Sequence, residues 1–188
     1  MKKWFSAILF SGCMAFMAQA QWSYPLAENS QNWRSVDDRV MGGVSQSLSG
    51  LLESGEFAFA GRMSLANNGG FASIRAPLII PEAAATDAHK IRINVQGDGK
   101  RYQLRFRTSG RFDGISYAVS FPTEPNAVLT YEFALSDFRP TWRGRVVPNA
   151  PALTWTDVRQ VGWMLTDKQP GDFALVIHEM TWTKAILI

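Results

Sequence analysis

The chain has 188 residues, of which 46% are hydrophobic and 12% aromatic, and 19 Lys and Arg against 16 Asp and Glu give a net charge of +3. This length is enough for one domain with its own core, and the small net charge argues against nucleic acid as a partner. The only cysteine is Cys13. The rest of the chain therefore has no disulfide, cysteine-type zinc site or cysteine nucleophile.

The first twenty residues have the features of a secretory signal peptide. Lys2 and Lys3 form a basic start, residues 4–17 are largely apolar, and Ala-Gln-Ala at 18–20 is a small-x-small cleavage site. The apolar run is too short to cross a membrane, and no second run of spanning length follows. We expect cleavage after Ala20, a single domain over residues 21–188, and a periplasmic or secreted location. Lipoprotein processing at Cys13 is the alternative, but Cys13 lies inside the apolar run.

Residues 33–47, WRSVDDRVMGGVSQS, are predicted to form a shaped loop between strands, because they lack both helical and strand periodicity. The pair Gly42-Gly43 lets the backbone adopt a positive φ or approach another group closely. Asp38 and Arg39 precede this pair. They either form an ion pair that fixes the loop, or Asp38 accepts and Arg39 donates hydrogen bonds to a polar ligand or partner.

Alternation of apolar and polar residues with a period of two recurs through the remainder of the chain. It marks residues 57–65, 91–95, 102–106, 115–121, 129–135, 161–165 and 173–177. Glycine, asparagine, aspartate and proline cluster between these stretches, as in turns. The pattern predicts an all-β, antiparallel β-sandwich or barrel with little helix. One helical turn is expected within residues 81–89, and residues 139–156 are expected to be an irregular excursion.

Five motifs in chain order carry a family resemblance. Besides 33–47 they are NNGGFASIR at 67–75, GDGKRY at 97–102, FRPTWRGR at 138–145 and GWMLTDKQPGDF at 162–173. Together, from about Trp33 to about Trp182, they resemble the CIA30 family, the complex I intermediate-associated protein 30 domain. The resemblance implies a galactose-binding-domain-like β-sandwich, a jelly roll, without a known catalytic site. The best-known members of this family are assembly factors for respiratory complex I.

Motifs for catalysis and cofactors fail on inspection. Residues 43–47, GVSQS, end in serine where a nucleophile elbow needs glycine. In residues 97–102, Tyr102 stands where a dinucleotide fingerprint needs its third glycine, so we interpret this segment as a hairpin turn between strands around Ile93 and Leu104. Asp37, Asp38 and Asp98 are hard oxygen ligands, but EF-hand spacing is absent; structural calcium stays an open alternative. We expect no enzyme, no cofactor and no metal.

Polar and aromatic residues outside the first loop supply further candidates for binding. Trp142, Arg143 and Arg145 have the composition of an interface anchor or a sugar-stacking platform, unless Trp142 closes the end of the sandwich. Arg101, Arg105 and Arg107 share one strand parity, and Lys90 and Arg92 share one on an expected neighbouring strand. The resulting basic stripe is either a solvated sheet face or a site for an acidic partner or polyanionic glycan.

The leading interpretation is an exported, non-enzymatic binding module that recognises a protein partner, as an assembly factor or chaperone-like protein. A leader peptide directs the chain away from the compartment in which complex I assembly factors act, which favours a task on envelope proteins. The alternative is a carbohydrate-binding module of the cell envelope, and an envelope glycan-acting enzyme is less favoured. The predicted contact residues are Asp38, Arg39, Gly42, Gly43, Asn68, Arg101, Arg105, Trp142, Arg143 and Arg145.

Overall fold

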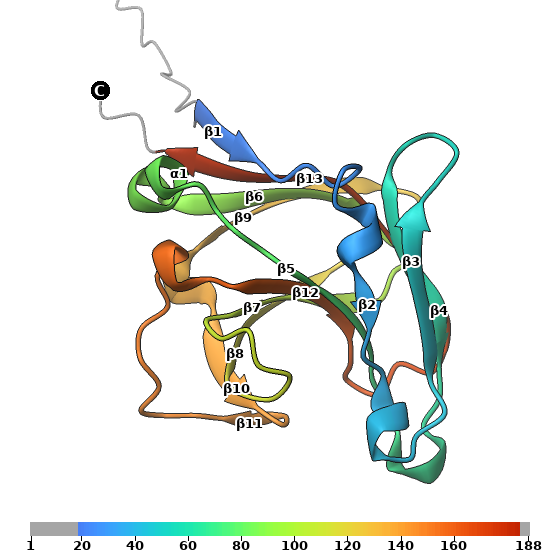
Figure 1. Ribbon diagram of the computed structural model, residues 1–188. Helices are drawn as coiled ribbons and strands as arrows, with labels where there is room; N and C mark the ends of the chain where they lie inside the picture. Colours follow the sequence, from blue (N-terminus) through green and yellow to red (C-terminus); the bar gives the residue numbers. More distant parts are fainter. Residues whose placement is uncertain (1–18, 185–188) are drawn as a thin grey trace, which may run out of the picture.

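The computed structural model describes residues 19–184, and in it two antiparallel sheets face each other (Figure 1). Sheet A has the order β3-β4-β13-β6-β9, with β1 paired to β13, and sheet B has the order β11-β10-β8-β7-β12-β5-β2. The sheet A strands are β1 (Gln19–Ser23), β3 (Gln46–Leu51), β4 (Phe57–Met63), β6 (Lys90–Gln96), β9 (Val128–Ala134) and β13 (Gly171–Lys184). The sheet B strands are β2 (Arg34–Ser35), β5 (Ala72–Pro77), β7 (Arg101–Arg107), β8 (Ser116–Pro122), β10 (Arg139–Trp142), β11 (Arg145–Val146) and β12 (Gln160–Leu165). The predicted antiparallel β-sandwich is confirmed.

One apolar core fills the space between the sheets. The alternation read from the sequence sends every second residue inward, so that Ile91, Ile93 and Val95 of β6 are fully buried. Burial of each aliphatic side chain of this size contributes about 1.5–3 kcal/mol. Rings join the sheets, since Trp155 lies 5.4 Å from Phe106 of sheet B and 5.8 Å from Trp182 of sheet A, measured between ring centroids.

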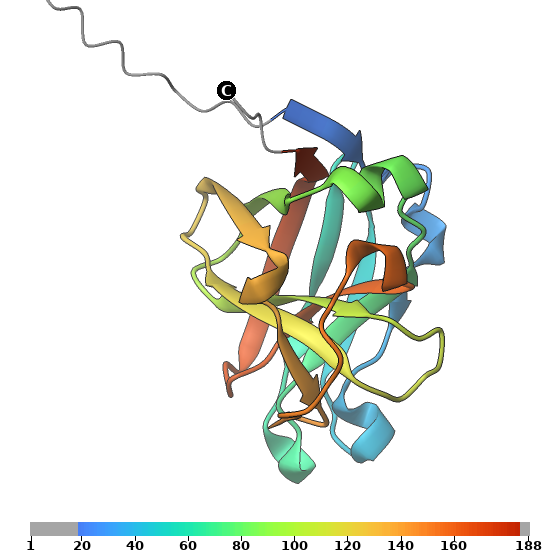
Figure 2. The same ribbon diagram turned by 90° about the vertical axis from the view of Figure 1, so that its left-hand side faces the viewer.

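Helices are few and short. The helical turn expected within residues 81–89 is α1 (Glu82–Asp87). The other turns are 3-10 helices: η1 (Ser30–Asn32), η2 (Asp38–Met41), η3 (Ala66–Asn68), η4 (Leu135–Asp137) and η5 (Trp155–Asp157). The first loop was expected to contain no helix, and η2 corrects that expectation. In Figure 2, η2 and η3 lie side by side at the foot of the molecule, where the Asn67 side chain donates to the Gly42 carbonyl oxygen at 3.2 Å.

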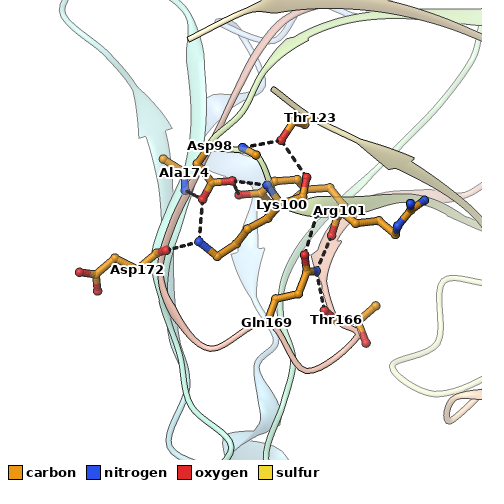
Figure 3. A network of polar contacts seen from close by, with 10 residues as sticks. Asp98, Lys100, Arg101, Thr123, Thr166, Gln169, Asp172 and Ala174 are labelled. Carbon is orange, nitrogen blue, oxygen red and sulfur yellow. Dashed lines mark hydrogen bonds and ion pairs between the residues drawn. The ribbon is translucent and has the colours of Figure 1, made fainter. Parts of the chain in front are cut away.

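The segment Gly97–Tyr102 does not form the expected hairpin, because β6 belongs to sheet A and β7 to sheet B. It carries the chain from one sheet to the other. Asp98 stabilises this crossover by accepting from the Lys100 ammonium and from the Ala174 backbone N–H, each at 3.2 Å (Figure 3). It also accepts from the Tyr102 hydroxyl at 3.0 Å. Gln169 pairs with the Arg101 backbone at 2.9 and 2.8 Å in the same network. The two glycines therefore serve a tight inter-sheet turn.

Residues 139–156 are more regular than expected. β10 and β11 form a hairpin that extends the edge of sheet B. Its two central residues have positive φ, 46° at Arg143 and 77° at Gly144, as in the two-residue turns that match strand twist. The turn directs Arg143 toward the outer face of sheet B, where it matters below.

The expected signal peptide and the lipoprotein alternative at Cys13 fall mostly on residues 1–18, outside the described residues. The expected cleavage site after Ala20 falls inside β1. C-terminal to this cleavage site, Trp22 and Ser23 pair with Trp182 and Thr181 of β13. From residue 19 to residue 184, no helix is long and apolar enough to span a membrane.

Candidate ligand-binding groove

A groove of about 530 Å³ crosses the outer face of sheet B. Strands β5, β7, β8 and β12 form its floor, and η2, the β7–β8 loop and the β10–β11 turn form its rim. In Figure 1 the β10–β11 hairpin and η2 lie below the lower sheet on opposite sides. Polar lining residues include Arg75, Arg105, Arg107, Asp113 and Arg143, and apolar ones include Val36, Val40, Met41, Phe71, Phe112 and Met164. The volume is typical of sites for small molecules.

The floor is basic because of strand alternation. In β7, Tyr102, Leu104 and Phe106 are buried in the core, so Arg105 and Arg107 point outward. Arg75 occupies the equivalent outward position of β5. We call Arg75, Arg105 and Arg107 the arginine cluster.

Gly162 lies at the centre of the arginine cluster. It pairs with Arg75 of β5 on one side of β12 and with Arg105 of β7 on the other. A small cavity of about 30 Å³ lies over it, lined by all three arginines of the cluster. Because Gly162 has no side chain, a bare stretch of backbone lies between Arg75 and Arg105.

The arginine cluster has neutral partners. Arg105 donates to the Thr141 hydroxyl at 3.0 Å and to the Met164 sulfur, and its buried Nε has no hydrogen-bond partner. Arg75 donates to the Phe112 carbonyl oxygen, and Arg107 to the Gly114 carbonyl oxygen, each at 2.8 Å. None of these acceptors carries a charge that offsets the guanidinium groups.

Burial and mutual repulsion act on these three groups. Burial, followed by the charges of Arg107 and Arg75, lowers the pKa of Arg105 to about 10. Burial is also the largest cause that lowers the pKa of Arg75 and of Arg107, while Asp113 opposes the shift in both. The fold thus holds the three cations where their charged forms are disfavoured.

The rim combines one acid with aromatic and cationic side chains. Asp113 accepts from the Trp142 indole N–H at 3.0 Å and from Arg143 at 2.7 Å. These hydrogen bonds, that of Arg143 first, lower the pKa of Asp113. Phe112 is 65% exposed, and the Arg75 guanidinium lies 4.5 Å from its ring centroid. Trp142 is 46% exposed, so it does not close the end of the sandwich, and it lies behind Asp113 rather than among the lining residues.

The first loop has a structural role, unlike the ligand contact expected for Asp38. That carboxylate is 0% exposed and accepts from Ser45 N at 2.9 Å, Ser45 Oγ at 2.6 Å and Gly70 N at 2.7 Å. Burial raises the pKa of Asp38, but the hydrogen bonds from Ser45, Gly70 and Phe71 outweigh it and lower the pKa overall. Both carboxylate oxygens are occupied by the protein itself.

The position of Asp38 explains why this loop contains two glycines. Gly42 has φ +90°, and a Cβ on Gly43 would overlap the Asp38 carboxyl carbon. Arg39 is exposed on η2, and it is not part of an ion pair with Asp38 among the described residues. The segment therefore shapes one rim of the groove, to which it contributes Val40 and Met41.

Other predicted residues lie apart from the groove. Asn68, Arg101 and Arg145 are exposed and are not lining residues. The predicted basic stripe is wrong, because Lys90 and Arg92 lie on β6 of sheet A, where Glu132 pairs with them at 3.4 and 3.0 Å. Of the ten predicted contact residues, Arg105 and Arg143 line the groove.

Sequence reasoning missed Arg75, Phe112, Met164 and Met41 as groove residues. Arg75 follows the outward parity of its strand, which was a usable signal. Its proximity to Arg105 depends on the insertion of β12 between β5 and β7, and β12 comes more than fifty residues later than Arg105. Alternation within one strand does not contain that information.

Comparison with known proteins agrees with this architecture. The family model described as "Complex I intermediate-associated protein 30 (CIA30)" matches residues 22–177. The chain belongs to the CIA30 family. An uncharacterized protein of Schizosaccharomyces pombe is 27% identical over 181 residues, covering 81% of this chain and 78% of that protein.

Solved structures share the fold. The family 11 carbohydrate-binding module from Clostridium thermocellum, in complex with a β-1,3-1,4-mixed-linked tetrasaccharide, has a TM-score of 0.66 and 14% identity, over 92% of this chain and all of that one. An agarase has a TM-score of 0.54 and 7% identity over 90% of this chain and 25% of its own. At these identities the likeness shows the galactose-binding-like β-sandwich alone.

The groove has the composition of a binding site. Asp113 is its one lining carboxylate, whereas most glycoside hydrolases use a pair. Within residues 19–184, no group of three or more His, Cys, Asp and Glu residues is placed to hold a metal ion. Family and fold together indicate a binding domain.

Proposed function

We propose that this CIA30-family chain is a non-catalytic module that binds an oligosaccharide in the sheet B groove. The groove itself carries the proposal: about 530 Å³ on the outer face of one sheet, with arginine and hydroxyl donors on the floor and apolar side chains at the rim. A sugar presents hydroxyl groups to such donors and C–H faces to rings such as Phe112. The shared fold with a carbohydrate-binding module and with part of an agarase supports this assignment.

Calorimetric titration with oligosaccharides tests the proposal. The panel begins with the neutral β-1,3-1,4-mixed-linked tetrasaccharide and with agaro-oligosaccharides. Phe112→Ala removes an exposed ring from the rim and should weaken binding about tenfold without unfolding the chain. Leu48→Ala on sheet A is the matched control, because Leu48 is also 65% exposed. Equal losses for both variants, or no binding by any saccharide, would contradict the proposal.

A protein partner is the second candidate. Val40, Met41 and Phe112 leave apolar surface exposed on the rim, a feature of interaction sites, and the family description points to complex I intermediates. This reading predicts that deleting the gene lowers the amount of assembled complex I on native gels. The wild-type gene should restore it, whereas Met41→Asp should not. Unchanged complex I would remove this candidate.

The export expected from the first twenty residues belongs to the same proposal. Saccharide binding in the envelope requires that the mature chain leave the cytoplasm. Cell fractionation and N-terminal sequencing should find a chain that begins at Gln21. An uncleaved cytoplasmic chain would favour the complex I candidate instead.

A further inference from the structure

The arginine cluster is more strongly basic than a neutral ligand requires. Arg75 and Arg105 face each other across Gly162, and Arg107 is the next outward residue of β7. A guanidinium has five N–H donors in a planar fork, which matches the oxygens of a carboxylate or sulfate. The hydrogen bonds given above use only some of these donors, and the buried N–H at Arg105 Nε has no acceptor.

The nearest acid does not neutralise the cluster. Asp113 interacts electrostatically with Arg75 and Arg107, but its two oxygens accept from Trp142 and Arg143. No acid is among the causes that shift the pKa of Arg105, and the charges of Arg107 and Arg75 only add repulsion. A buried cation without a counterion is costly, and a ligand anion would remove that cost.

Charged residues on the opposite sheet are arranged differently. Lys90 and Arg92 on sheet A both form ion pairs with Glu132. These two cations of sheet A thus have a carboxylate partner, whereas no acid acts on Arg105 in the groove. That contrast is local, because residues 21–188 carry 17 basic and 16 acidic residues in all.

We propose that the arginine cluster binds an anionic substituent of the saccharide, a carboxylate or a sulfate, so that the ligand is an acidic oligosaccharide. The anion lies over Gly162 between Arg75 and Arg105, and the sugar ring that carries it extends toward Phe112 and Met164. This inference rests on the proposed function, because it identifies the substrate class of the same groove.

Matched ligand pairs test the charge alone. Tetragalacturonate is compared with its methyl ester, and a κ-carrageenan oligosaccharide with its desulfated form, by calorimetric titration of the purified chain. The charged member of at least one pair should bind about tenfold or more tightly than its neutral partner, and rising salt should weaken it. The pair that responds distinguishes a carboxylate from a sulfate.

Variants assign the effect to the cluster. Arg75→Gln and Arg105→Gln should each weaken the charged ligand about tenfold and the neutral ligand less, so that the preference for the charged member of the pair falls. Lys90→Gln and Arg92→Gln on sheet A are the matched controls and should leave both affinities unchanged. Thermal unfolding shows whether each variant is folded. Because two arginines are replaced independently, the test still holds if one of these variants does not fold.

The outcomes separate this inference from the proposed function. Equal binding of charged and neutral members, including the neutral mixed-linked tetrasaccharide, would overturn the acidic ligand and leave the groove's saccharide role intact. If no saccharide bound, charged or neutral, but poly-glutamate did, and Arg105→Gln abolished that binding, both the acidic ligand and the saccharide role would be overturned. The cluster would then be assigned to an acidic protein. Charged binding that survives both arginine variants would overturn the assignment to this cluster.

Discussion

The first loop and the arginine cluster of sheet B differ in how their charged groups are satisfied. In the first loop, protein donors occupy both oxygens of Asp37 and of Asp38, with bonds from Ser45, Ser47, Gly70 and Ser73. In the arginine cluster the side chains are only partly buried, their partners are neutral, and some donors are left without an acceptor. A closed network of this kind stabilises a fold, whereas an open one provides the groups that a ligand needs.

The largest effect should follow from opening the closed cluster. Asp38→Ala leaves the donors of Ser45 and Gly70 without their acceptor in a site that is 0% exposed. We expect the free energy of unfolding to fall by roughly 3–5 kcal/mol, measured by urea denaturation. Arg39→Ala, at the exposed neighbouring position, should cost less than about 0.5 kcal/mol. A similar small cost for both would show that Asp38 does not stabilise the loop.

A smaller loss should come from crowding the same carboxylate. Gly43→Ala places a methyl group against Asp38, and the loop must shift to accept it. We expect a loss of about 1–3 kcal/mol in the free energy of unfolding. The control is Gly50→Ala, because a Cβ there meets nothing within 4 Å. Equal stabilities for the two variants would contradict the close approach of Gly43 to Asp38.

The closed cluster also predicts a pH dependence. The pKa of Asp38 is lower in the folded chain than in the unfolded one, so its carboxylate contributes stability at neutral pH. That contribution is lost as the pH falls below the ordinary aspartate value, about 3.9, and through the lower folded value. The difference in the free energy of unfolding between wild type and Asp38→Ala should therefore narrow as the pH falls from about 5 to about 2. A difference that stays constant would exclude this linkage.

How far the sequence predicts these clusters depends on the range of the contacts. Alternation along β6, β7 and β12 is local, so the strands and the buried face were predictable. Sheet membership was not, because β13 inserts between β4 and β6, and β12 between β5 and β7. For this reason the turn at Gly97 looked like a hairpin, and Lys90 appeared to be a neighbour of Arg105.

The same limit applies to the candidate site. Asp38 and Gly42-Gly43 stood out in the sequence as an unusual motif, and the structure gives them a stabilising role. Their acceptor and donor partners at Gly70 and Phe71 lie about thirty residues away. A polar motif in a sequence shows that its groups need partners. Whether the protein or a ligand supplies them becomes clear only in three dimensions.

The open cluster should respond in the opposite direction from the closed one. Arg105→Met removes a buried guanidinium and keeps much of its apolar length. Since no carboxylate offsets that charge, the free energy of unfolding should stay the same or rise by up to about 2 kcal/mol. Urea denaturation checks this, with Arg101→Met at the exposed start of β7 as control. A loss above about 2 kcal/mol would mean that Thr141 and Met164 already satisfy the guanidinium.

The smallest effect is expected on sheet A, where Glu132 forms ion pairs with two cations. Glu132→Gln leaves Lys90 and Arg92 without a carboxylate partner. The variant therefore has unpaired cations on sheet A, as the arginine cluster has on sheet B, but on an open sheet face. Partly exposed ion pairs contribute little, so the free energy of unfolding should fall by less than about 1 kcal/mol. Titration with tetragalacturonate should show no new site, because solvated cations gain little from one anion. If the variant did acquire such a site, unpaired charge alone would be enough for binding. The groove, its apolar rim and the bare backbone at Gly162 would then lose their part in the explanation.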